Sequence, residues 1–213
     1  VRKCYKIPQE LYYFWSIQNY GIYFVILTFE KVCLLKFFLR YYSMKKILLL
    51  SDTHSYIDDQ ILKFVHQADE VWHAGDIGQL AVTDTIKKIK PLRAVFGNID
   101  DKNARSEFDL DLKFIVEGVS VWITHIGGYP NKYNQRIRTE INQNPPDIFI
   151  TGHSHILKVM YDKKLNLLHL NPGAAGNHGF HKIRTMLRFE LDSGEIKNME
   201  IIELSKRGAN SMK

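Results

Sequence analysis

The chain has 213 residues, of which 45% are hydrophobic and 24% are charged, and it contains two cysteines. This length suits one domain with a sizeable core, with or without an appendage. The apolar content excludes wholesale disorder, and two cysteines exclude a disulfide framework. The net charge of +6 is uneven, since residues 1–43 carry +4 and residues 44–213 carry only +2, so the charge gives no argument for a nucleic-acid partner.

Residues 1–43 form a leader that differs in composition from the rest of the chain. Leu11 to Phe29 is an uncharged run just long enough to cross a bilayer. Three interpretations are open: a membrane anchor, an apolar helix packed on the domain or a partner, or an upstream extension outside the native coding sequence. Met44-Lys-Lys before an apolar strand is typical of a protein start and favours the third. The leader contains no small-residue cleavage site of the kind that would indicate a secretory signal.

The first half of the remaining segment, residues 44–213, alternates strands and helices. Apolar runs and helical spacing predict, in chain order, a strand at 46–51, a helix at 57–68, a strand at 70–72, a helix at 81–89 and a strand at 93–96. This order predicts a parallel sheet with right-handed crossovers.

The second half is richer in hairpins. It predicts a helix at 131–144, a strand at 147–151, and three hairpins: 114–116 with 119–124, 158–161 with 166–170, and 186–191 with 197–204. We expect mostly antiparallel pairing here. Two α/β halves, each with its own sheet, predict a four-layer α/β/β/α sandwich. The last strand, 197–204, would be an edge at which two copies of the chain could pair.

Polar side chains that can bind metal come immediately after the predicted strands. They are Asp52, His54, Asp76, Asn98, His125, His153 and His155. Ligands gather at the carboxyl ends of strands in open α/β sheets. Mixed oxygen and nitrogen donors suit Mn²⁺, Fe²⁺, Zn²⁺ or Ni²⁺ and suit Ca²⁺ poorly. The glycines before several of these residues let the chain turn sharply and let substrate approach.

The other histidines have weaker claims to the site. His66 lies in a predicted helix and is interpreted as structural, and His73 and His169 as packing groups or supports of the ligands. His178 and His181 follow a glycine-rich loop that could face the site, and the sequence leaves both alternatives open for them.

With its Asp-x-His, Gly-Asp, Gly-Asn, His and Gly-His-x-His motifs, the segment 44–213 resembles the calcineurin-like metallophosphoesterase superfamily, in particular its small single-domain bacterial and archaeal phosphodiesterases. The resemblance implies a binuclear centre. One metal would take Asp52, His54, Asp76 and His155, and the other Asp76, Asn98, His125 and His153. Asp76 would bridge the two metals and, with Asn98 and His125, would act in catalysis through a metal-activated water.

One position departs from the family pattern. Many relatives have histidine after the motif asparagine, where it is thought to assist the leaving group, but this chain has Ile99. A positioned acid is worth about 10²–10⁴ in rate, so we expect slow turnover of esters with poor leaving groups. Asp100 could orient a ligand or water from outside the ligand set, and His178 or His181 could supply the missing acid.

The leading hypothesis is therefore a metal-dependent phosphodiesterase, with Mn²⁺ as the expected metal and a small phosphate ester as substrate. The competing hypothesis is a non-catalytic scaffold of the same fold, like the resembling retromer subunit, which binds partner proteins. A nuclease is disfavoured by Ile99, by the absence of a capping domain and by the small net charge of 44–213. The lack of cysteine after residue 43 fits a cytoplasmic location.

Overall fold

A computed structural model describes residues 11–17, 22–28 and 44–208. The chain forms two compact units, residues 1–44 and 45–213. In the first unit, β1 (Leu11–Ile17) pairs antiparallel with β2 (Ile22–Thr28). An apolar helix is therefore wrong for these residues, whose aromatic and β-branched side chains favour strands. Across the described residues, no helix is long and apolar enough to span a membrane. Whether the leader is an extension stays a prediction.

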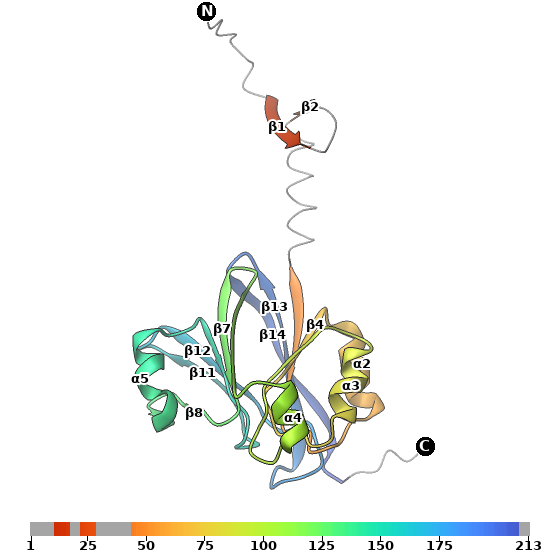
Figure 1. Cartoon of the computed structure of the whole chain (residues 1–213), viewed down its shortest axis with the longest axis vertical. Helices are drawn as coiled ribbons and strands as arrows, with labels where there is room; N and C mark the ends of the chain where they lie inside the picture. The colour runs from red at the N-terminus through yellow and green to blue at the C-terminus, as the bar shows by residue number, and fades with distance from the viewer. Residues whose placement is uncertain (1–10, 18–21, 29–43, 209–213) are drawn as a thin grey trace, which may run out of the picture. The chain divides into compact units, whose positions relative to one another are not determined.

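The second unit contains two five-stranded sheets, several strands of which are labelled in Figure 1. The strands of the first sheet are, in spatial order, β14 (Glu195–Lys206), β13 (Ile183–Asp192), β3 (Lys45–Leu50), β4 (Glu70–His73) and β5 (Leu92–Ala94). The last three are parallel, and helices α2 (Asp59–Gln67) and α3 (Ala81–Lys87) connect them. The predicted β-α-β-α-β order is confirmed.

The second sheet is mixed. Its strands are, in spatial order, β11 (Leu157–Asp162), β12 (Leu167–Pro172), β10 (Ile148–Ile150), β7 (Val119–Thr124) and β6 (Asp111–Val116). The two predicted hairpins, β6–β7 and β11–β12, are antiparallel, but the central strand β10 is parallel to both of its neighbours. The expectation of mostly antiparallel pairing therefore fails at the centre, where α5 (Gln135–Gln143) acts as a crossover between β7 and β10.

The last hairpin, β13–β14, corrects the expected division into two halves. β13 pairs antiparallel with β3, so this hairpin extends the first sheet and not the second. Two further differences are local. The predicted helix at 131–144 begins only at Gln135, because β9 (Lys132–Tyr133) pairs with β8 (Gly128–Tyr129). A short helix, α4 (Lys102–Glu107), was not predicted; the side chain of Asp101 caps it.

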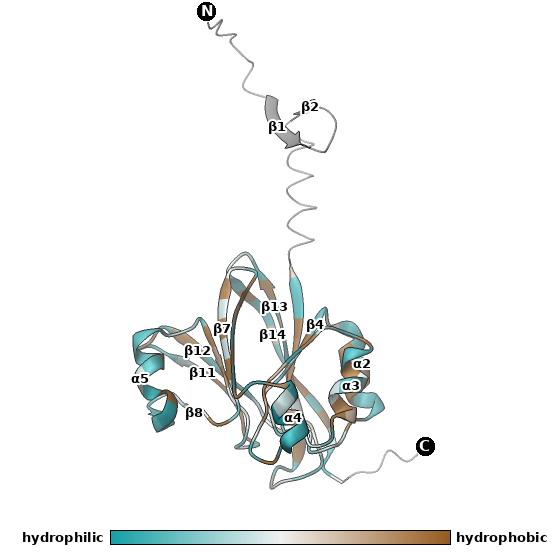
Figure 2. Cartoon of the chain, in the orientation of Figure 1, coloured by the Kyte–Doolittle hydropathy of each residue, from teal (hydrophilic) through white to brown (hydrophobic). Residues whose placement is uncertain are grey.

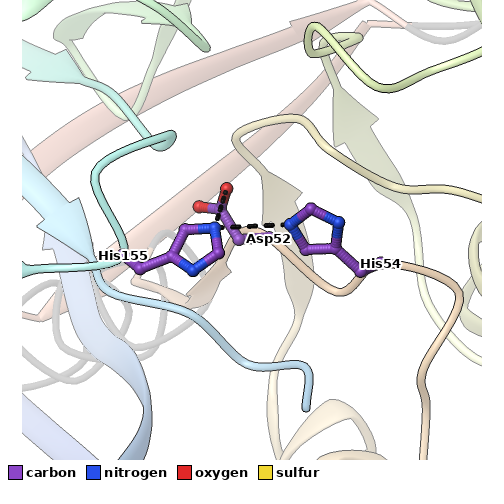
Figure 3. Close-up of side chains that lie close together, drawn as sticks. All are labelled: Asp52, His54 and His155. Atoms are coloured by element: carbon purple, nitrogen blue, oxygen red, sulfur yellow. Dashed lines mark hydrogen bonds and ion pairs between the residues drawn. The ribbon is translucent and has the colours of Figure 1, made fainter. Parts of the chain in front are cut away.

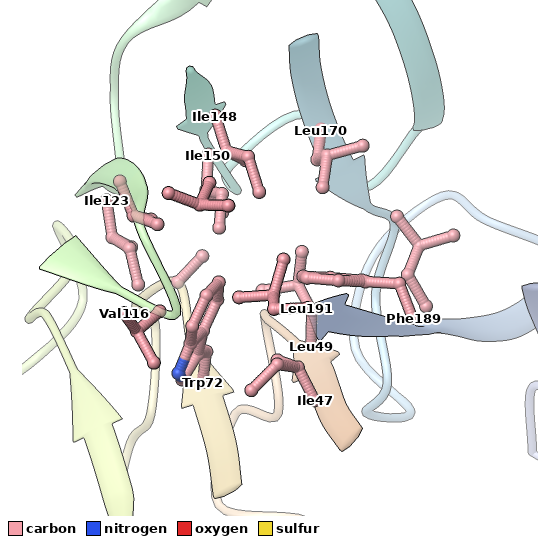
Figure 4. Packing of buried hydrophobic residues seen from close by; sticks show 14 of the residues in the cluster. Ile47, Leu49, Trp72, Val116, Ile123, Ile148, Ile150, Leu170, Phe189 and Leu191 are labelled. Atoms are coloured by element: carbon pink, nitrogen blue, oxygen red, sulfur yellow. The ribbon is translucent and has the colours of Figure 1, made fainter. Parts of the chain in front are cut away.

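The four layers follow from the alternation of side chains along the buried strands. One face of each sheet contributes to a shared core, in which Ile47 and Leu49 of β3 lie with Ile148 and Ile150 of β10. Figure 4 shows these side chains between the sheets, together with Trp72. The outer face of the first sheet packs on α2 and α3, and the outer face of the second packs on α5. The fold is the predicted α/β/β/α sandwich.

The surface helices differ from the sheets in polarity. Figure 2 shows hydrophilic colouring over most of α4 and α5, whereas the strands carry much of the hydrophobic colouring. In α5, only Ile137 and Ile141 are buried, four residues apart on one face. The loops at the carboxyl ends of β3, β4, β5, β7 and β10 lie outside these hydrophobic layers and can hold polar side chains.

Candidate metal centre

Five of the seven predicted ligands have a backbone conformation that residues other than glycine rarely adopt. Their φ angles are positive: 54° at Asp52, 46° at His54, 53° at Asp76, 66° at His153 and 55° at His155. Each such residue costs on the order of 1–3 kcal/mol. Strain of this kind concentrates at functional sites, where the surrounding structure holds a side chain in one direction. The loops after β3, β4 and β10 are therefore shaped around these side chains.

The first group of potential ligands joins the loops of both sheets. Ligand atoms of Asp52, His54 and His155 lie within 4.8 Å of one another. In Figure 3, dashed lines join His155 to both other side chains: its Nε2 lies 3.1 Å from Oδ1 of Asp52 and 3.3 Å from Nε2 of His54. The other oxygen of Asp52 accepts hydrogen bonds from the Ser51 hydroxyl and the His153 amide. This leaves Oδ1 directed at the histidines.

The second group consists of Asp76, His125 and His153, whose ligand atoms also lie within 4.8 Å of one another. Oδ1 of Asp76 lies 3.2 Å from Nε2 of His125, and Oδ2 lies 3.7 Å from Nε2 of His54. The two oxygens of Asp76 therefore face the two groups. This arrangement suits a carboxylate that bridges two cations, since an anion between them offsets their repulsion.

The hydrogen bonding of His125 indicates what the site needs. Its Nδ1 donates to the carbonyl of Ala74 at 2.8 Å, so in a neutral ring Nε2 carries a lone pair. That lone pair faces the Asp76 carboxylate, and two electron-rich atoms at this distance need a proton or a cation between them. Nε2 of His125 and Oδ1 of Asp52 are both buried without a hydrogen-bond partner. Buried polar atoms rarely lack partners, so this donor set fits divalent metal ions.

The charges of the site perturb its titration. Burial lowers the pKa of His54, and this outweighs the attraction of Asp76 and Asp52. At His125, burial also lowers the pKa, but the interaction with the nearby Asp76 carboxylate and the charge of Asp52 raise it above the ordinary value. Burial raises the pKa of Asp76, yet the interactions with His125 outweigh it and hold that pKa below the usual range.

Two glycines let the loops of the two sheets approach each other. A Cβ at Gly75 would lie 2.7 Å from Nδ1 of His125, and a Cβ at Gly152 would lie 2.2 Å from the Ser51 hydroxyl oxygen. Gly152 has no positive φ, so close approach and not a sharp turn explains this glycine. The sequence predicted that glycine here gives room to substrate. At Gly152, the structure instead shows that glycine allows loops of the two sheets to come into contact.

Asn98 and Asp100 have different positions in the loop after β5. Asn98 is exposed and lines a hollow together with His125. Asp100 is buried, and its carboxylate accepts hydrogen bonds from the amides of Ile77, Gly78 and Gly97. Asp100 therefore ties the loop carrying Asn98 to the loop carrying Asp76.

Arg105, which sequence reasoning missed, supports the same loop from α4. Its guanidinium donates to the carbonyls of Gly97, Asn98 and Asp100. No motif in the sequence pointed to it, because the contact depends on how α4 folds back over the loop.

Of the remaining histidines, His178 and His181 contact the first group. The ring of His178 lies 4.8 Å from that of His54, and the ring of His181 lies 5.4 Å from that of His155. His181 donates from Nε2 to the Gly176 carbonyl, which leaves its buried Nδ1 without a partner. The loop after β12 therefore faces the site.

His66, His73 and His169 lie outside both groups. His66 is exposed on α2. His73 is fully buried and bonded to the Thr53 hydroxyl and the Gly75 amide. It thereby supports the loops that carry Asp52 and Asp76. His169 is buried beside Phe149.

Comparison with known proteins places this arrangement in a family. A family model described as "Calcineurin-like phosphoesterase superfamily domain" matches residues 44–194. The chain belongs to the calcineurin-like phosphoesterase superfamily. The resemblance inferred from the motifs is confirmed, and membership makes the protein a phosphoester hydrolase by family.

Individual relatives cover the same segment. A probable metallophosphoesterase of Mycoplasma genitalium is 31% identical over 140 residues, which cover 62% of this chain and 77% of that protein. Among solved structures, one described as a novel archaeal phosphodiesterase is 22% identical, with a TM-score of 0.56, covering 75% of this chain and 99% of the other. Zinc-bound Vps29 from Entamoeba histolytica is 17% identical, with a TM-score of 0.55, covering 74% and 98%. These two structures are evidence for the fold alone.

Proposed function

We propose that the protein is a metal-dependent phosphodiesterase with a binuclear centre, and that Mn²⁺ is its metal. The observation that carries the proposal is the position of Asp76, whose two oxygens face the two groups of candidate ligands. Each group contains a buried polar atom that lacks a hydrogen-bond partner. Asp52, His54, Asp76 and His155 would hold one ion. Asp76, Asn98, His125 and His153 would hold the other.

When bound, two such ions lower the pKa of a coordinated water and withdraw charge from phosphoryl oxygens. The residues of the chain prepare the site for that chemistry. His125 keeps its Nε2 free by donating from Nδ1 to Ala74, and the Ile99 amide donates to Oδ1 of Asp76, which fixes the carboxylate. Asp52 is held in place by the Ser51 hydroxyl. Orientation of this kind keeps the ligands in one geometry before substrate arrives.

Ile99 is 46% exposed beside Asn98, so no acid stands at this position. We propose that diesters with good leaving groups are the better substrates, because they need the least protonation as the bond breaks. His178 is exposed, its ring lies 4.8 Å from that of His54, and it is the candidate for assisting poorer leaving groups.

A non-catalytic scaffold is the second candidate, and the structural similarity to Vps29 favours it as an alternative. The presence of all seven predicted ligands argues for metal binding and, with it, catalysis. A cytoplasmic location and self-association through the edge strand β14 are further proposals, and no nucleic-acid partner is proposed.

The test uses the full chain, stripped with chelator and reloaded with Mn²⁺. Hydrolysis of bis(p-nitrophenyl) phosphate and of p-nitrophenyl phosphate is measured side by side, and bound metal is counted by mass spectrometry. We expect metal-dependent cleavage that favours the diester. Asp76→Asn should lose both activity and bound metal, while His66→Ala on the exposed face of α2 should retain both.

The outcomes separate the candidates. Preference for the monoester would contradict the phosphodiesterase. A protein that binds two metals and hydrolyses neither ester would support the scaffold. Equal losses in the Asp76→Asn and His66→Ala variants would mean that the centre lies elsewhere.

A further inference from the structure

Next to the second ligand group lies a hollow of about 230 Å³ that the metal centre does not use. His125 and His153 form one side of it. The β8–β9 hairpin and β11 also line the hollow, with Tyr129, Lys132 and Lys158. A group bound here would therefore sit against the loops that carry the ligands.

The two lysines of this hollow lack acidic partners. Within the described residues, Lys132 and Lys158 make no ion pair, whereas Lys45, Lys113 and Lys197 each pair with a carboxylate. Nζ of Lys158 lies 3.5 Å from the centre of the Tyr129 ring. The ring holds the ammonium in position without neutralising its charge.

The wall between the hollow and the centre is well fixed. The side-chain amide of Asn171 donates to the carbonyl of Gly152 at 2.8 Å and to the hydroxyl of Ser154 at 3.2 Å. Gly152 and Ser154 flank His153. An anion held by the lysines and a phosphate held at the centre would therefore keep a constant separation, as two groups of one substrate molecule require.

A second hollow, of about 290 Å³, also includes His125 but has a different character. Phe96, Leu110 and Ile126 line it. Its arginines are already engaged, since Arg105 donates to backbone carbonyls and Arg136 pairs with Asp111. Of the cations that line these two hollows, the two lysines are the ones with no carbonyl or carboxylate partner among the described residues, so their N–H groups are free to donate to a ligand.

We propose that the lysine hollow binds an anionic group, a carboxylate or a phosphate, on the part of the substrate that is not the leaving group. The substrate is then a phosphodiester with a second negative charge. This inference rests on the proposed function. Lys132 and Lys158 supply the charge, and Tyr129 orients Lys158. A charged hydrogen bond in a partly enclosed site favours such a substrate by about tenfold or more in kcat/KM.

The test compares two diesters with the same leaving group and nearly the same length: p-nitrophenyl 2-carboxyethyl phosphate and p-nitrophenyl propyl phosphate. The Mn²⁺-loaded full chain should prefer the carboxylate ester by about tenfold, mainly through a lower KM. Lys158→Met and Lys132→Met should each reduce the preference severalfold and leave kcat/KM for the propyl ester nearly unchanged. Lys163→Met is the matched control, because Lys163 is exposed at the far end of β11, about 16 Å away.

A second measurement does not depend on turnover. In the chelator-treated protein, inorganic phosphate should protect Lys132 and Lys158 from acetylation, as followed by mass spectrometry, and should leave Lys163 reactive. Equal use of both diesters by the wild type, or equal losses for both diesters in the lysine variants, would overturn the inference. If the wild type hydrolyses neither diester, the proposed function fails. Protection of Lys132 and Lys158 from acetylation then tests, without any turnover, whether the hollow binds an anion.

Discussion

Gly152 offers a direct test of how the two sheets build the centre. An alanine at this position would place its Cβ 2.2 Å from the Ser51 hydroxyl oxygen, 2.8 Å from the Ala74 carbonyl oxygen and 3.0 Å from Oδ2 of Asp52. Two of these three atoms belong to backbone or to a predicted ligand, and all three lie in the loops that follow β3 and β4 of the first sheet. The clash can be relieved only by moving the loop after β10 away from the loops after β3 and β4.

The expected cost follows from these contacts. Overpacking of this kind destabilises a protein by about 1–3 kcal/mol. For a domain of this size, that corresponds to a fall of roughly 2–12 °C in melting temperature. The displacement also stretches the hydrogen bond of 3.1 Å from the His153 amide to Asp52. Loss of such supporting bonds lowers metal affinity by about 10–100-fold.

The assay is thermal unfolding of the full chain with and without Mn²⁺, since a ligand that binds the folded state raises the melting temperature by an amount that grows with the logarithm of its affinity. Gly194→Ala is the control: its Cβ would meet nothing within 4 Å, but its φ of 86° makes the substitution cost about 1–2 kcal/mol. Both variants should melt earlier, and only Gly152→Ala should lose the stabilisation by Mn²⁺. If Gly152→Ala keeps the full metal-induced shift, the reasoning about sheet contact is refuted.

Three further predictions concern stability and the leaving group. Burial lowers the pKa of His73 and of His169 to about 4 each. Because the unfolded chain protonates first, near pH 6.5, stability should be complete above that pH and decline toward pH 4, by about 2 kcal/mol per histidine at pH 5. Denaturant unfolding in chelator should show this slope, and His169→Gln should remove about half of it; a flat profile contradicts the prediction. Asp58→Ala should cost about 3–5 kcal/mol, because it leaves the fully buried Arg184 without its ion-pair partner, and denaturant unfolding measures this. A cost below 1 kcal/mol would count against the pair. His178→Ala should slow alkyl diesters more than p-nitrophenyl diesters, and equal slowing of both would exclude a role in leaving-group departure.

Much of the first sheet could be predicted because the signals are local. The apolar runs at β3 and β4 and the helical spacing of α2 each occupy a short segment, and a β-α-β order allows few topologies. The candidate ligands were predicted from the chain because each lies in the loop after an apolar strand, and carboxyl ends of parallel strands lie at one edge. The boundaries of α5 were missed, because the pairing of β8 with β9 takes up the residues before Gln135.

The sequence by itself predicted the candidate ligands and determined the order in which the chain presents them. Only the tertiary structure decided how they combine. β13 pairs with β3 across more than a hundred residues, and no local pattern indicates which sheet a hairpin will join. The division of the ligands around Asp76 and the contact of His178 with His54 likewise depend on loops from different sheets meeting. Such contacts are selected by the shared burial of the two sheets, and that is a property of the packed whole.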